Sequence, residues 1–149
     1  MGRAITRATL VSGTLDILFA IILTLLFGRH VDDMLRYVAS GPYPPAVDMG
    51  FAGAALGLLV HFALMAIMAS VFVWIVSKRR VLLDTPVSTG MLYGAATYVV
   101  MNWVVVPLRF GTVPVKPLSI VTQLFAHLVL VGLVFAWIAA KEMRSRIRS

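Results

Sequence analysis

The sequence predicts an all-α protein, a transmembrane four-helix bundle made of two αα hairpins with both termini in the cytoplasm. Three observations predict it. Sixty per cent of the 149 residues are hydrophobic and only 13% are charged, against roughly 25% charged residues in a soluble domain. Four apolar stretches are long enough to cross a bilayer, and basic residues lie between and beyond them. A soluble fold of this size could not bury so much apolar surface, so we expect one integral membrane domain over residues 1–149.

The four predicted spans cover about residues 8–28, 51–76, 87–108 and 118–140. A transmembrane helix needs roughly 20 mostly apolar residues, because the hydrocarbon core is about 30 Å thick. All four stretches meet this length, and they lack the polar–apolar alternation of barrel strands. The chain contains no cysteine, which excludes disulfides and thiol chemistry.

The basic residues predict the orientation of these spans. With alternating spans, nine of the basic residues collect on one side of the membrane and four on the other. The positive-inside rule places the richer side, with both termini, in the cytoplasm. We expect Lys141, Arg144, Arg146 and Arg148 in the tail to attract anionic lipid headgroups. Because the basic charge follows the topology, it gives no support to nucleic-acid binding. The nine are Arg3, Arg7, Lys78, Arg79, Arg80, Lys141, Arg144, Arg146 and Arg148.

Two further patterns concern packing and the first loop. Residues 31–39 have the spacing of a short amphipathic helix on the outer surface, either as a plain connection or as a lid or partner surface. Gly53 with Gly57, and Gly90 with Gly94, form Gly-x-x-x-Gly pairs. Such pairs allow close helix approach, either within the bundle or between copies in a homo-oligomer or with a membrane partner.

Three ionisable residues within the spans form the candidate site. Asp16 lies roughly 12 Å from the start of the first span at 1.5 Å per residue. His61 and His127 lie roughly 15 Å and 13 Å from the outer ends of the second and fourth spans. Ionisable groups inside a membrane cost several kcal/mol unless they are paired or hydrated. We therefore expect these three side chains to face one another near the midplane.

Three polar residues extend this candidate site. Tyr98 and Asn102 share one face of the third span, and Gln123 lies one turn before His127. We expect Tyr98 near the level of the histidines, with Asn102 and Gln123 above them in the bundle interior. The cluster has three interpretations: structural bonding between helices, a proton or ion path, and metal or haem ligation by His61 and His127.

Several short strings resemble those of a family of small uncharacterised bacterial four-helix inner-membrane proteins, and distantly those of the YagU-like proteins. The resemblance covers most of the chain, including a histidine in the second and fourth spans. It implies a multi-pass protein of the bacterial inner (cytoplasmic) membrane and carries no activity. The strings are Gly13-Thr14-Leu15-Asp16, Tyr93-Gly94 and Met101-Asn102-Trp103-Val104-Val105-Val106-Pro107-Leu108.

The sequence lacks a nucleophile–base pair, a phosphate-binding Gly-rich loop and a carboxylate dyad, so we do not expect an enzyme. The first hypothesis is small-solute or proton/ion transport through the midplane Asp/His site. The second is a haem-binding electron-transfer subunit that uses His61 and His127. The third is a non-enzymatic accessory or assembly protein of a membrane complex.

Overall fold

A computed structural model describes residues 1–113 and 115–145, with side chains through residue 143, and within those ranges it contains helices, turns and no strand. Four helices are long and apolar enough to cross a membrane, which confirms that prediction. Two are continuous α-helices, α1 (Gly2–Leu26) and α3 (Gly50–Lys78). The third consists of α4 (Pro86–Val99), η3 (Val100–Val105) and α5 (Val106–Phe110), and the fourth of α6 (Pro117–Phe125), η4 (Ala126–Leu133) and α7 (Val134–Ser145). Shorter pieces are α2 (Val31–Ser40), η1 (Pro44–Asp48) and η2 (Arg80–Leu83).

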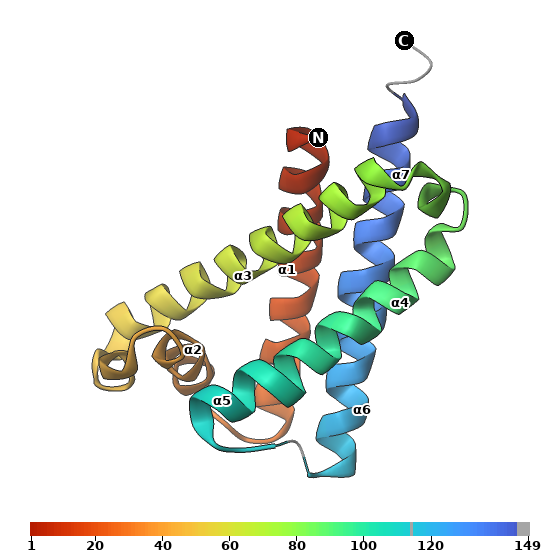
Figure 1. Cartoon of the computed structure of the whole chain (residues 1–149). Coiled ribbons are helices and arrows are strands. Elements are labelled where there is room, and N and C mark those ends of the chain that lie inside the picture. Colours follow the sequence, from red (N-terminus) through yellow and green to blue (C-terminus); the bar gives the residue numbers. More distant parts are fainter. Residues whose placement is uncertain (114, 146–149) are drawn as a thin grey trace.

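The ends of the bundle differ in what they carry (Figure 1). The N-terminus, the end of α7 and the connection from α3 to α4 lie at one end, called here the terminal end. Helix α2 and the connection from α5 to α6 lie at the opposite end, called here the loop end. Helices α3 and α4 run obliquely across α1 and the fourth helix.

The outer surface of the bundle is apolar on all four long helices. Leu26 is 75% exposed, Phe51 89%, Leu108 83% and Trp137 78%. A surface of this kind is suited to lipid rather than water, so the chain is a multi-pass membrane protein. Helix α1 begins six residues before its predicted start, because a helix continues past the apolar segment into the polar interface. In the basic tail, Arg146 and Arg148 lie outside the described residues.

The main core lies toward the terminal end. Ala4 and Ala8 of α1 pack with Phe72 and Val73 of α3 and with Phe135 of the fourth helix. Alanines on α1 allow the larger side chains of its neighbours to approach its backbone, so dispersion holds the helices together. The ion pair between Arg7 and Glu142 joins α1 to α7 beside this core.

Two glycines of α3 allow α2 and η1 to pack closely against it. A Cβ atom on Gly57 would overlap the Leu35 carbonyl, and one on Gly53 would overlap the Ala46 carbonyl of η1. This Gly-x-x-x-Gly pair therefore packs against the first loop rather than against another span. The second pair packs within the bundle, because Gly90 and Gly94 meet the backbone of Gly132 and His127 on the fourth helix.

Two of the four long helices contain π-helical turns. The turn η3 ends two residues before Pro107. The proline nitrogen donates no hydrogen bond, and its ring crowds the carbonyl four residues earlier, at Trp103 within η3. A wider turn accommodates such a proline, and Gly111 with φ 66° ends the helix in the left-handed region. The turn η4 spans Ala126–Leu133 and contains His127. Such turns are frequent at functional sites.

Candidate functional site

Asp16 and His61 meet between α1 and α3. The Asp16 Oδ2 atom lies 3.9 Å from Nδ1 of His61. The Asp16 side chain is 20% exposed and that of His61 is 11% exposed. At this distance the two groups form an ion pair only when His61 is protonated, while a direct hydrogen bond needs about 2.7–3.2 Å. An approach of about 1 Å, or one bridging water, would connect them.

The backbone of α1 fixes the orientation of His61. Its Nε2 atom lies 2.9 Å from the Gly13 carbonyl oxygen, which only accepts hydrogen bonds, so Nε2 carries a proton and donates it. Nδ1 of the neutral ring is then a basic lone-pair nitrogen directed at Asp16. Gly13 permits this contact because a Cβ there would lie 2.7 Å from the Phe62 ring.

His127 is fixed by a similar bond within its own helix. Its Nδ1 atom lies 2.9 Å from the Gln123 carbonyl oxygen, so Nδ1 donates and Nε2 of the neutral ring keeps a lone pair. His127 is 9% exposed. Asp16 lies within electrostatic range of both His127 and His61, and it approaches His61 the more closely of the two, at 3.9 Å. The structure thus brings Asp16 near two imidazoles whose other ring nitrogens are each held by a backbone carbonyl.

Tyr98 adds a hydroxyl group without a protein partner. Its ring contacts the His127 ring edge-on, with centroids 5.8 Å apart. The side chain is 7% exposed, and Oη has no hydrogen-bond partner among the described residues. A buried hydroxyl of this kind usually bonds to water or to a ligand. The polar cluster therefore has capacity for a further hydrogen bond on the His127 side.

Two residues of the predicted site lie elsewhere. Gln123 is exposed, and only its backbone carbonyl takes part in the site, through His127. Helix α6 packs mainly against α4 at the loop end, so its polar side chains are not enclosed as we expected. Asn102 is half-buried, and its Nδ2 atom donates to the Tyr98 carbonyl of the same helix at 3.2 Å. This bond engages the Asn102 amide with the backbone of its own helix, so the amide makes no contact with Asp16, His61 or His127 that the structure records.

Two residues position the site in ways that the sequence did not predict. Ser12 is fully buried, and its hydroxyl donates to the Leu130 carbonyl at 2.6 Å, which ties α1 to η4 one turn from Asp16. Its spacing of four residues from Asp16 was the available signal. Gly94 lets α4 approach the backbone of His127 and Leu128 directly. The Gly-x-x-x-Gly pattern indicated a close approach but not its partner.

Helix α2 is held in place at the loop end by contacts with α5. Arg109 donates from Nε to the Gly41 carbonyl at 2.6 Å and from Nη2 to the Ser40 carbonyl at 2.8 Å. These bonds cap the C-terminus of α2, where a positive charge is favourable. The Tyr37 ring stacks on Phe110 with centroids 4.4 Å apart. Helix α2 is thereby fastened both to α3 and to the end of α5.

Charges on α2 are paired within the helix. Arg36 forms ion pairs with Asp32, at 2.8 Å, and with Asp33. Desolvation is the largest single influence on the pKa of Asp32 and acts to raise it. The hydrogen bond and charge of Arg36, together with backbone hydrogen bonds, outweigh desolvation, so this pKa lies below its ordinary value. The contribution of the pair to stability is therefore complete above an unfolded pKa of about 3.9 and is lost as pH falls through the folded pKa.

The geometry bears on the haem alternative. Nε2 of His61, which would bind iron, is already bonded to the Gly13 carbonyl. Across the described ranges, no three His, Cys, Asp or Glu side chains are grouped so that they could hold a metal ion. Asp16, His61 and His127 are each able to bind and release a proton.

Comparison of the chain with protein-family models, with curated proteins and with solved structures returned no match.

Proposed function

We propose that this chain is a non-enzymatic membrane transporter that moves protons, or a small solute coupled to protons, through Asp16, His61 and His127. One observation carries the proposal. A carboxylate oxygen of Asp16 lies 3.9 Å from the basic nitrogen of His61, and the other nitrogen of that ring is fixed by the Gly13 carbonyl. Ionisable groups placed in this way inside a membrane commonly form proton relays.

The pair is most stable with one proton to share. If Asp16 is ionised and His61 is neutral, two acceptors face each other and repel. A proton on Asp16 gives a carboxylic acid that faces a lone pair, and a proton on His61 gives an imidazolium that faces a carboxylate. Loading and release therefore change the hydrogen bonding between α1 and α3. Such a change is a means of coupling proton movement to helix movement.

His127 extends the path toward the fourth helix. The charge of Asp16 acts on His127, and the Tyr98 hydroxyl beside that ring is available to water or to a solute. A proton would pass between the basic nitrogens of the two imidazoles by way of the Asp16 carboxylate. The backbone carbonyls of Gly13 and Gln123 keep each tautomer in place during transfer.

The proposed setting is the inner membrane of a bacterium, with both termini in the cytoplasm. The unequal distribution of the 13 basic residues supports this orientation. In that orientation the terminal end faces the cytoplasm, and α2 lies at the outer end of the bundle.

Proton flux into proteoliposomes tests the proposal. Purified protein is reconstituted with a pH-sensitive dye in the lumen, and a potassium diffusion potential drives proton entry. We expect Asp16→Asn and His61→Gln to reduce the flux about tenfold or more, because neither replacement can exchange a proton near neutral pH. The glutamine amide can still donate to the Gly13 carbonyl, so the α1–α3 contact is retained.

Gln123→Leu is the matched control, since Gln123 is polar, lies in a predicted span and is exposed. Its flux should equal that of the unmodified protein. Flux that survives unchanged in both Asp16→Asn and His61→Gln would exclude the pair as the transport site. A loss of equal size in Gln123→Leu would show that the assay reports general damage.

A further inference from the structure

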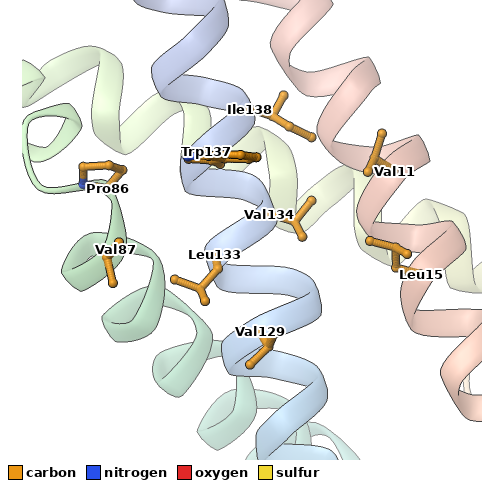
Figure 2. A pocket seen from close by; sticks show the side chains of 9 residues that line it. All are labelled: Val11, Leu15, Pro86, Val87, Val129, Leu133, Val134, Trp137 and Ile138. Atoms are coloured by element: carbon orange, nitrogen blue, oxygen red, sulfur yellow. The ribbon is translucent and has the colours of Figure 1, made fainter.

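An apolar groove of about 510 Å³ follows the outer face of the fourth helix near the terminal end (Figure 2). Its volume lies within the roughly 300–1,000 Å³ typical of ligand sites. Val134, Trp137 and Ile138 of α7 form a central ridge. Val11 of α1 lies on one flank of the ridge and Val87 of α4 on the other. Nine residues line it, which are Val11, Leu15, Pro86, Val87, Val129, Leu133, Val134, Trp137 and Ile138.

The lining side chains determine what kind of ligand the groove can bind. Apart from the indole nitrogen of Trp137, they offer only hydrocarbon, which leaves a polar ligand without partners along the groove. The residues from Val129 to Trp137 extend roughly 12 Å along the helix axis at 1.5 Å per residue. A flexible hydrocarbon chain parallel to the helices would fill such a groove.

Positive charge lies at the terminal end of the groove. Lys141 is exposed one turn beyond Trp137, and Arg7 lies one turn before Val11 on α1. Arg7 pairs with Glu142 but keeps a 54% exposed side chain. The charge of Glu142 is offset by Arg7, and Lys141 adds a positive charge on the same face as Trp137. A Trp side chain next to a Lys is also typical of the membrane interface.

We propose that the groove binds the acyl chains of an anionic phospholipid whose phosphate group lies at Lys141 and Arg7. The apolar lining accounts for the chains, and the basic end accounts for the charge of the headgroup. The two flanks of α7 accommodate the two chains of one lipid. The lipid site contains none of Asp16, His61 and His127. A result that contradicts one proposal therefore leaves the other untouched.

Fluorescence of Trp137 tests the site directly. A protein with Trp137 as its single tryptophan is made by Trp74→Phe and Trp103→Phe. It is reconstituted in vesicles of phosphatidylcholine with a minor share of phosphatidylglycerol, and the acyl chains of one lipid at a time are brominated to quench fluorescence. At equal bromine content, we expect brominated phosphatidylglycerol to be enriched at Trp137 about fivefold over brominated phosphatidylcholine.

Trp74 provides a matched control within the same chain. It is 59% exposed, has Lys78 one turn beyond it, and does not line the groove. Trp74 and Lys78 therefore have the same four-residue spacing as Trp137 and Lys141, but Trp74 lies outside the groove. A protein with Trp74 as its single tryptophan should show a clearly smaller preference for the anionic lipid. Equal preference at the two tryptophans would mean general attraction to the surface and would overturn the proposed site.

Lys141→Gln in the single-Trp137 protein tests the headgroup contact. We expect most of the anionic preference to disappear, while quenching by phosphatidylcholine continues because the apolar groove is intact. Lys116→Gln, at the loop end, should leave the preference unchanged. A preference that persists in Lys141→Gln would overturn the assignment of the phosphate. Far-ultraviolet circular dichroism confirms that each variant keeps its helix content.

Discussion

Two tyrosine hydroxyls on α4 have opposite surroundings. The Tyr93 hydroxyl donates to the Met68 carbonyl of α3 at 2.7 Å. The Tyr98 hydroxyl is buried beside His127 and has no partner among the described residues. A buried hydroxyl that makes no bond costs about 1–3 kcal/mol, whereas a satisfied one contributes about 0.5–1.5 kcal/mol. The same substitution at the two positions should therefore have different effects.

We expect Tyr98→Phe to leave the free energy of unfolding unchanged or to raise it by about 1 kcal/mol, since an unpaired polar atom is removed. We expect the proton flux to fall, because this buried hydroxyl is a polar group beside His127 that has a hydrogen bond left to offer to a water or a solute. Tyr93→Phe should lower the free energy of unfolding by about 1 kcal/mol and leave the flux unchanged. Thermal unfolding in detergent and the vesicle flux assay measure both. Equal destabilisation by the two variants would show that Tyr98 has a structural partner.

For individual residues, counting along the sequence predicted which ones lie at the same depth in the membrane. Asp16 and His61 were placed near one level by residue rise alone, and the structure puts their side chains 3.9 Å apart. Gln123 was expected in the interior but is exposed. Periodicity assigns a residue to a helix face, but it does not say whether a neighbouring helix covers that face. The Gly13 carbonyl that orients His61 was equally invisible, because every residue carries a carbonyl.

Helix α2 is the element whose position depends most on glycine. Gly57 of α3 lies against the backbone of Leu35, and any side chain there would overlap it. We expect Gly57→Ala to displace α2 and to speed hydrogen exchange of the amides of residues 31–40 by about tenfold or more, while α3 remains folded. Mass spectrometry of exchanged peptides measures this effect.

Ala55→Leu is the control for this substitution, because Ala55 lies on the same helix and is exposed. It adds more atoms than Gly57→Ala but points away from α2, so exchange of residues 31–40 should not change. If Gly57→Ala and the unmodified protein exchange at the same rate, α2 does not depend on this contact. The spacing of Gly53 and Gly57 predicted a close approach, but only the fold shows that the first loop provides the partner.

For the whole molecule, the main prediction concerns orientation. The chain has no cysteine, so any thiol is an introduced one. Thr85 and Thr112 are both exposed. Thr85 belongs to the connection from α3 to α4 and Thr112 to the connection from α5 to α6, and these connections lie at opposite ends of the bundle. In intact bacterial cells, we expect a membrane-impermeant maleimide to label Thr112→Cys and to label Thr85→Cys only after permeabilisation. The reverse pattern would place the termini outside.

The number of spanning helices could be predicted from the sequence because the lipid bilayer, as the solvent, permits few structures. Stretches of about 20 apolar residues can only be satisfied in lipid as helices, so their number and approximate limits were predictable. The oblique course of α3 and α4 was not, since it depends on which small residues meet, as at Gly90 and Gly132. The π-helical turn that carries His127 also leaves no simple signature in the sequence.

The contact of Gly94 with the backbone of His127 has a consequence for variation in this chain. The third long helix contributes no acid or imidazole to the cluster, yet its backbone sets how far the fourth helix can approach. A single added methyl group at Gly94 would push away the turn that holds the His127 ring. The proposed transport should therefore be sensitive to a change in the long helix that carries no acid or imidazole of the cluster.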